Sequence, residues 1–491
     1  MSSDERKIEI ENGSIKSAQD WQGSSQSDLE SQVDKSDRDT NTVPEYSFFD
    51  PKLSAQRKRL KFEFSRVYII MIIGIMGLFS IYWGSMYGRN DRIRNLRMLV
   101  VIEDDITIEG IPPILGDTLR EVLETPTALT RGNWHIFNSS EFAKLAAENN
   151  NNIEQELERQ IHHQNYWSSI YVKPNATWNF YNALIQGDGK YNVSNNSIIS
   201  VYETGRDFVA MNQYVTPSIQ MIERIWLGEQ TNMTQPLLDL MSNASEVLSQ
   251  PGTMQLLASP IQFIYFDRIK YTDPVLLAPS QVGLIYTIIV TFFQFNFLGE
   301  VHIAVAKSGV NKRHYVIYRF LASVASFFVL SFAASIVSLA FQVDFTKAFG
   351  HSGFLVYWAI SFLTMWAVGS ASELAALLCI TVYPPLIGFW LMFWVIINVA
   401  PTFTPLALSA KFYRYGYAMP IYNSYEATKV VLFNTYKGAL GRHIGILIAW
   451  IVLLTIALPF ALAYFGKTMT KKAQLAAQKQ AMEEQQKQLE E

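Results

Sequence analysis

Cysteine and the common catalytic motifs are what this sequence lacks. Its single cysteine, Cys379, stands among apolar residues, which excludes a disulfide within the chain and argues against a cysteine-based metal site. The 491 residues contain no GxxxxGKS/T phosphate loop, no GxSxG elbow and no HExxH zinc motif. We therefore expect no enzyme activity, no ATP hydrolysis by this chain alone, and no cofactor.

An excess of charge of either sign is also missing. The chain has 40 Lys and Arg against 43 Asp and Glu, a net charge of −3, so no nucleic-acid partner is expected. The N-terminal stretch is rich in Ser, Asp, Glu and Gln and too poor in apolar residues to offset the loss of chain entropy. Residues 1–56 are therefore predicted to be a disordered acidic tail in the cytosol.

The sequence does contain long apolar runs. Residues 66–88 hold about twenty apolar or small residues, the length that crosses a bilayer core of roughly 30 Å. Five basic residues stand at or before the start of this run: Arg57, Lys58, Arg59, Lys61 and Arg66. Basic residues beside a first span favour the cytosolic side. Residues 57–88 are thus predicted to form a basic flank and the first transmembrane helix, with the N-terminus inside.

Five further apolar segments predict a membrane domain at 282–466. They are 282–299, 314–341, 354–373, 376–400 and 444–465. The basic connection 307–319 and the lysines beyond 466 then face the cytosol, as the positive-inside rule requires. Two segments abut at 374–385, where Pro384 and Pro385 favour a tight turn. The predicted fold class is an α-helical multi-pass membrane protein with six transmembrane helices, followed by a cytosolic helical tail at 467–491.

Residues 89–281 read as a folded extracytoplasmic domain between the first and second spans. Strand-like runs rich in β-branched and aromatic residues alternate with helical stretches, which predicts an α/β or α+β domain. The predicted strands are 97–105, 134–137, 166–172, 198–203 and 261–267. Ser139 or Ser140 is the expected cap of a helix that breaks near 149–152.

The same stretch carries six Asn-x-Ser/Thr triplets, at Asn138, Asn175, Asn192, Asn195, Asn232 and Asn243. Outside it, only Asn12 in the N-terminal tail begins such a triplet. Chance triplets arise in any Asn- and Ser-rich sequence, so a single one carries little weight. A cluster on the side already predicted to be outside favours N-glycosylation in a secretory compartment.

Residues 401–443 fit the topology least well, because five basic residues fall on the predicted outer side. Tyrosines crowd around Pro405 and Pro420, and such residues favour the headgroup layer. We expect an interfacial or re-entrant element packed between the spans and the large domain, with a plain surface loop as the alternative. Arg414 and Tyr415 are the candidate lipid or substrate contacts here, because a guanidinium grips a phosphate bidentately. Glu373 is a further candidate, expected near the cytosolic boundary within reach of water.

One span, a large outer domain and five more spans is also the layout of ABC-2-type membrane proteins and of the bacterial phage-infection protein group. Several stretches resemble more particularly the fungal nitrosoguanidine-resistance family, whose members share a domain of unknown function. These stretches are NLRMLVVIEDD (95–105), NYWSSIYVKPNATWNFYNAL (165–184), KYNVSNNSIISVYETGRDF (190–208), SPIQFIYFDRIKYTDP (259–274), VGLIYTIIVTFF (282–293) and KFYRYGYAMPIYNSYEATKVVLF (411–433). The resemblance covers about residues 60–470.

The resemblance implies tolerance of toxic compounds and a role in phospholipid asymmetry, as a transporter or as a regulator of one. It implies the plasma membrane, with the endoplasmic reticulum as the alternative, and supplies no catalytic residue. Membrane lipids are the expected partners. An ABC-2-like body would also need a separate ATPase or lipid flippase. The competing hypothesis is a non-transporting scaffold or receptor whose glycosylated domain binds a partner.

The domain at 89–281 should carry N-glycans if it lies outside. Endoglycosidase treatment should then increase the gel mobility of the wild type and leave unchanged a variant with all six asparagines replaced by glutamine. A wild type that does not shift would remove this support for an outer domain.

Overall fold

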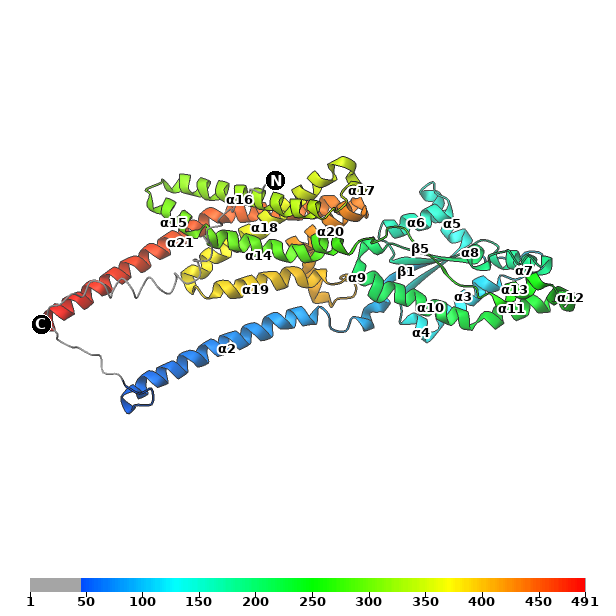
Figure 1. The fold of residues 1–491 in the computed structure, drawn as a ribbon, viewed down its shortest axis with the longest axis horizontal. Coiled ribbons are helices and arrows are strands. Elements are labelled where there is room, and N and C mark those ends of the chain that lie inside the picture. The colour runs from blue at the N-terminus through cyan, green and yellow to red at the C-terminus, as the bar shows by residue number, and fades with distance from the viewer. Residues whose placement is uncertain (1–45, 491) are drawn as a thin grey trace, which may run out of the picture. The chain divides into compact units, whose positions relative to one another are not determined.

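The structure is a computed structural model that describes residues 46–490 (Figure 1). The predicted disordered tail lies outside the described residues up to position 45. Helix α2 (Ser54–Gly84) begins within the last residues assigned to that tail. Residues 71–491 form one compact unit, and every contact discussed below lies within it.

Residues 89–281 form a domain around a mixed five-stranded sheet, which we call the sheet domain. The strand order is β2-β1-β3-β4-β5, with β3 and β4 antiparallel and the other neighbours parallel. The strands are β1 (Arg97–Ile102), β2 (Asn133–Asn138), β3 (Ser168–Val172), β4 (Ile198–Tyr202) and β5 (Ile264–Asp267). Each predicted strand is therefore confirmed, and the parallel pairs joined by helices make the domain α/β.

Two layers of helices cover the sheet, because successive side chains of a strand point to opposite faces. Met98, Val100 and Ile102 of β1 pack in one core with α3, α7 and α10. Leu99 and Val101 face the other way, onto α5 and α6 (Figure 1). The helices of the domain are α3 (Ile114–Glu124), α4 (Pro126–Leu129), α5 (Ser139–Glu148), α6 (Ile153–His162), α7 (Ala176–Gln186), α8 (Val193–Ser197), α9 (Phe208–Ala210), α10 (Thr216–Gly228), α11 (Gln230–Asp239), α12 (Ala244–Leu248) and α13 (Pro251–Ala258).

The cap of α5 differs from the sequence prediction. Asn138, not Ser139 or Ser140, is the N-cap: its side chain accepts from the Glu141 N–H at 2.8 Å. The Glu141 carboxylate accepts from the Asn138 N–H in return, which completes a capping box. The predicted break near 149–152 is confirmed, since α5 ends at Glu148 and α6 begins at Ile153.

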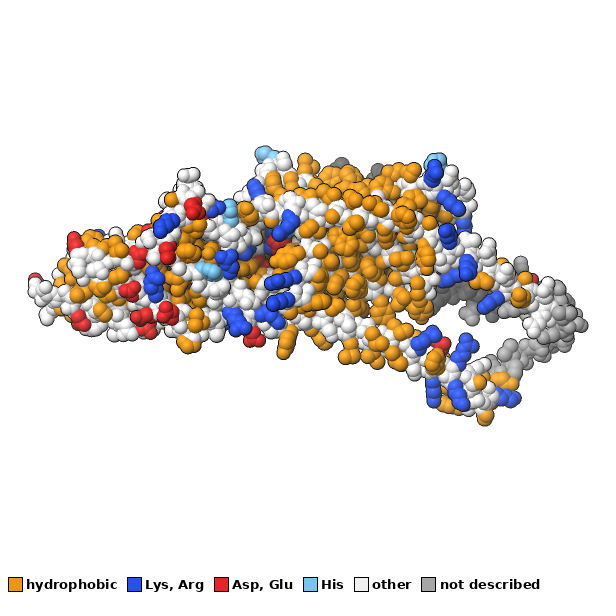
Figure 2. All heavy atoms as spheres, turned by 180° about the vertical axis from the view of Figure 1, so that it is seen from behind, with side chains coloured by type: hydrophobic (Ala, Val, Ile, Leu, Met, Phe, Trp, Pro, Cys, Tyr) orange, Lys and Arg blue, Asp and Glu red, His pale blue; other side chains and the backbone are white. Residues whose placement is uncertain are grey.

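Among the described residues, five helical segments are long and apolar enough to cross a membrane: Pro51–Gly84, Pro274–Lys307, Lys312–Ala340, Thr346–Val382 and Lys437–Gln486. The helices of these segments beyond α2 are α14 (Gly283–Phe297), α15 (Gly299–Lys307), α16 (Lys312–Ala340), α17 (Thr346–Phe349), α18 (Gly353–Val382) and α21 (Leu440–Glu490). Their outward faces are apolar, and Figure 2 shows these side chains gathered into a continuous surface bordered by Lys and Arg.

The turn predicted at Pro384 and Pro385 is confirmed, but the bounds of the fourth and fifth apolar segments differ from those expected. Helix α18 continues past 374 to Val382, because that stretch contains no helix breaker, and the turn falls at Pro384 and Pro385. Helix α19 (Leu386–Val399) has only 14 residues and rises about 21 Å, less than the roughly 30 Å of a bilayer core. The described residues therefore contain five long apolar helical segments and one short one, not the six long spans predicted.

Residues 401–443 contain a buried helix, α20 (Pro420–Phe433), preceded by a 3₁₀ helix at Lys411–Ala418. Helix α20 packs against α18 and α21 on one side and against residues 204–206 of the sheet domain on the other. Its apolar residues Ala427, Val431 and Leu432 are completely buried. Residues 401–443 therefore contain an element packed between the spans and the large domain, not a surface loop.

Gly116 of α3 should not tolerate a side chain. A Cβ there would lie 1.9 Å from the backbone oxygen of Asp104, whose carboxylate accepts from the Gly116 N–H. We expect Gly116→Ala to destabilise the protein by about 1–3 kcal/mol through overpacking, read as a lower thermal unfolding midpoint in detergent. The matched control is Gly228→Ala, where nothing lies within 4 Å of the new Cβ. Equal stability of the two variants would contradict this packing.

Candidate functional site

Arg414 and Tyr415 both lie on the 3₁₀ helix at Lys411–Ala418. Arg414 is exposed and has no ion pair within the part of the chain that the structure describes. The Tyr415 hydroxyl is buried without a hydrogen-bond partner among the described residues, and burial raises its pKa. Arg414 is thus exposed while the Tyr415 hydroxyl is buried, and their role as lipid contacts stays a prediction.

Glu373 does not reach water as expected. It is buried on α18, where its carboxylate pairs with Arg319 of α16 and accepts from Ser323 Oγ at 2.8 Å. Arg319, predicted to sit in a cytosolic connection, is likewise buried within α16. Since α16 and α18 pack together, the two charges compensate each other between helices. Glu373 is thus a structural partner in the helix bundle. Glu300, in the first turn of α15, is by contrast an exposed glutamate.

A polar cavity of about 390 Å³ lies where the sheet domain meets α20 and the start of α21; we call it the junction cavity. Its lining residues are Gln164, Trp167, Arg206, Asp207, Pro405, Leu406, Ala407, Tyr417, Tyr422, Glu426, Lys429, Ala439, Arg442 and His443. Charges of both signs and three aromatic rings therefore face one space. Neither Arg414 nor Glu373 belongs to this lining.

The sheet domain contributes Arg206 and Asp207, which lie at the end of the short 3₁₀ helix (Thr204–Arg206) after β4. The Arg206 guanidinium lies 3.7 Å from the centre of the Trp167 ring and donates to the Tyr166 backbone oxygen at 2.5 Å. Burial lowers the pKa of Arg206 to about 10. The Asp207 carboxylate accepts from the Ala210 N–H at 2.8 Å and so caps α9. Burial raises the pKa of Asp207, an effect that nearby Lys429 opposes.

Helix α20 contributes Glu426 and Lys429, one turn apart. The buried Lys429 ammonium donates to the Arg206 backbone oxygen and to the Glu426 carboxylate, each at 2.8 Å. The ammonium of Lys429 on α20 thus forms one of its hydrogen bonds with the backbone of the sheet domain. Burial raises the pKa of Tyr422, which keeps its hydroxyl neutral beside Glu426.

Arg442 lies at the beginning of α21, exposed at the edge of the junction cavity and 6.0 Å from the centre of the Tyr417 ring. An exposed guanidinium can bind an anionic group that enters the cavity, and Glu426 and Asp207 can receive a cationic one. Sequence reasoning passed over Arg206, Asp207 and Lys429 as site residues. The available signal was the excess of basic residues in 401–443 on the predicted outer side.

The sequence matches, over residues 67–456, the family described as "Protein of unknown function (DUF3533)". It is also 34% identical over 447 residues to a Saccharomyces cerevisiae protein, the uncharacterized endoplasmic reticulum membrane protein YJR015W. That match covers 88% of this chain and 85% of the yeast protein. No solved structure matches the chain. The family match extends over the sheet domain and over every residue that lines the junction cavity.

Breaking the pair between Arg319 and Glu373 should be costly. Glu373→Gln leaves a buried guanidinium without its counter-charge, a change that typically costs about 3–5 kcal/mol. We expect a markedly lower unfolding midpoint of the detergent-purified protein and less protein in membranes. Glu300→Gln makes the same chemical change at an exposed position and should behave as wild type. Equal stability of both variants would show that the buried pair is not structural.

Proposed function

From the premise that this chain belongs to the DUF3533 family of proteins of unknown function, we propose that it is a multi-pass membrane protein of the nitrosoguanidine-resistance type. In this proposal it contributes to tolerance of toxic compounds and to phospholipid asymmetry, as a transporter or as a regulator of one. The apolar helices and the yeast relative support a membrane protein. The finer role rests on the family resemblance and on the junction cavity.

The junction cavity is the observation that carries the proposal. A phospholipid headgroup with an amine presents one anionic and one cationic group. The cavity lining offers Arg442 for the phosphate, and Glu426 and Asp207 for the amine. Tyr417, Tyr422 and Trp167 add aromatic surface of the kind found at headgroup depth. The position beside α20 and α21 lets a headgroup enter the cavity while its acyl chains stay against apolar helices.

The topology that we propose has a cytosolic N-terminus and a glycosylated extracytoplasmic sheet domain. Helix α19 and its continuation to Thr402 would form a short sixth crossing. Because the sequence contains no nucleotide-binding motif, active transport would require a separate ATPase or lipid flippase. The proposed location is the plasma membrane, with the endoplasmic reticulum, where the yeast relative is placed by its name, as the alternative.

The proposal assigns the phosphate contact to an arginine at the cavity. In cells lacking the native chain, Arg442→Ala should fail to restore tolerance of toxic compounds and normal outward exposure of aminophospholipids. Arg442→Lys should restore both only in part, since a lysine cannot bind bidentately. Arg414→Ala tests the second candidate arginine in the same assay, and Lys411→Ala is the exposed control in the same stretch.

All variants are compared at equal amounts of membrane protein. If Arg442→Ala restores tolerance and lipid exposure as wild type does, the cavity assignment is wrong. If Arg414→Ala restores them as well, neither arginine contacts a lipid phosphate.

A further inference from the structure

The sheet domain has a second cavity, of about 670 Å³, at the carboxyl ends of β1 and β3; we call it the strand-end cleft. Its lining residues are Glu103, Ala143, Ala146, Ala147, Asn151, Asn152, Ile153, Glu154, Tyr171, Lys173, Pro174, Asn179, Tyr191 and Asn196. Glu103 follows β1 directly and Lys173 follows β3 directly. The cleft is separate from the junction cavity, since the two share no lining residue.

The sheet topology explains why a cleft opens there. After β1 the chain passes to β2 on one side of the sheet, and after β2 it returns to β3 on the other side of β1. The connections therefore leave β1 and β3 in opposite directions, and the loops diverge at their carboxyl ends. In open α/β sheets, ligands bind at this switch point.

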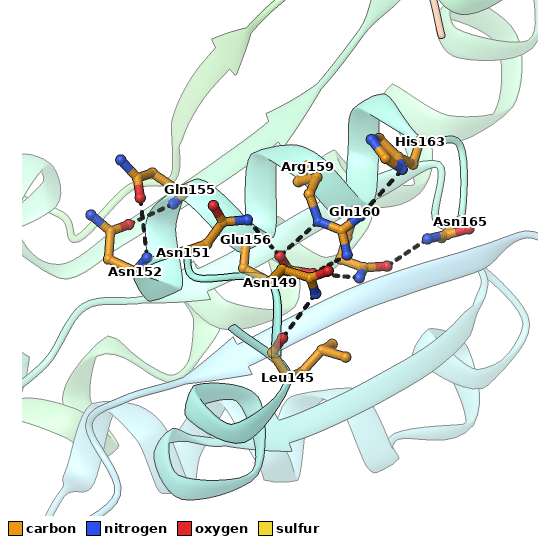
Figure 3. Close-up of polar contacts among 10 residues, drawn as sticks. All are labelled: Leu145, Asn149, Asn151, Asn152, Gln155, Glu156, Arg159, Gln160, His163 and Asn165. Atoms are coloured by element: carbon orange, nitrogen blue, oxygen red, sulfur yellow. Dashed lines mark hydrogen bonds and ion pairs between the residues drawn. The ribbon is translucent and has the colours of Figure 1, made fainter. Parts of the chain in front are cut away.

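One rim of the cleft is held in place by a buried carboxylate (Figure 3). Glu156 is completely buried, and its oxygens accept from Arg159, Gln160 and Asn151, the last at 2.8 Å. Asn152 caps α6 through the Gln155 N–H at 2.7 Å. These contacts tie the side chains of Asn149, Asn151 and Asn152 to the fold itself. The turn thereby forms a fixed wall of the cleft.

Four polar side chains of the cleft retain hydrogen-bonding capacity. One Glu103 oxygen accepts from the Tyr171 hydroxyl, which leaves the other oxygen unused. The side chains of Lys173 and Asn179 have no hydrogen-bond partner within residues 46–490. The Tyr191 hydroxyl is buried and equally unpartnered within these residues, and burial raises its pKa to about 12. A buried hydroxyl without a partner costs free energy that a ligand would recover.

The chemistry of these groups selects among ligand classes. Glu103 and Glu154 place two carboxylates at the cleft against one ammonium, Lys173, which disfavours a phosphate or another anion. No cluster of three metal-ligating side chains occurs among the described residues. Amide, carboxylate, ammonium and phenol groups together match ligand hydroxyls, each of which both donates and accepts. The alanines of α5 add a flat apolar wall against which a ring can lie.

We propose that the strand-end cleft binds a sugar unit. The proposal is independent of the lipid function proposed above and uses none of its residues. Two sources of the sugar share this chemistry: a glycan of another molecule, or a glycan of this chain. Asn175 stands directly after Pro174 of the lining and Asn195 directly before Asn196, so a glycan attached at either position starts at the rim.

The test is binding of the full-length protein to an array of immobilised mannose, glucose, galactose and N-acetylglucosamine oligosaccharides. The protein is purified in a detergent without a sugar headgroup and assayed before and after endoglycosidase treatment. We expect concentration-dependent binding to at least one series. Asn179→Ala and Tyr191→Phe should each weaken that binding at least tenfold.

Tyr191→Phe also separates a ligand contact from a structural role. Because its hydroxyl has no partner in the fold, the variant should keep or raise the thermal unfolding midpoint while losing affinity. Tyr181→Phe is the matched control: that hydroxyl lies 3.5 Å from the Leu240 oxygen, outside the cleft. The control should retain both affinity and stability.

Each of the following results supports or overturns the proposal. Binding in both glycosylation states supports a glycan of another molecule, and binding only after deglycosylation supports the proposal with the chain's own glycan as the occupant. Absence of binding in both states, or binding that Asn179→Ala and Tyr191→Phe leave unchanged, overturns it. A Tyr191→Phe variant that loses stability together with affinity overturns the assignment of that hydroxyl to the ligand.

Discussion

The buried ammonium of Lys429 is the contact on which the junction between α20 and the sheet domain depends. It donates to the Arg206 backbone oxygen of the sheet domain and to Glu426 of its own helix, each at 2.8 Å, so one of its two acceptors is present only when helix and domain are packed together. A buried lysine without these acceptors would be strongly unfavourable. The same contact places Arg206, Asp207 and Glu426 around one cavity. The contact that packs α20 against the sheet domain therefore also brings together residues of the junction cavity.

Two ion pairs in the described part of the chain, one between buried side chains and one between a buried and a partly buried side chain, serve different ends. The pair between Arg319 and Glu373 joins α16 to α18 within the apolar helices, and the described residues around it leave almost no space for a ligand. The pair between Lys429 and Glu426 borders a cavity of about 390 Å³ in which further charges remain accessible. The first pair is thus enclosed within the helix bundle, whereas the second borders a cavity.

Local patterning carried most of the element predictions. Runs of β-branched and aromatic residues identified the five strands, because alternating side chains must fill two cores of the sheet domain. Apolar length identified α2, α14, α16 and α21. The errors arose where two local signals competed. Ser139 and Ser140 are residue types that favour a cap, but the cap is the preceding Asn138, and Glu373 was placed by hydropathy alone.

The sequence by itself determined a membrane protein with one large domain of alternating strands and helices, since apolar length and strand composition are properties of consecutive residues. It could not determine the sites, because their members are distant in the chain: Arg206 and Lys429 are 223 positions apart, and Arg319 and Glu373 are 54 apart. Only the tertiary structure decided which charges are paired, which are buried and which face a cavity. The physical reason is that the free energy of a buried charge depends on partners that no local pattern specifies.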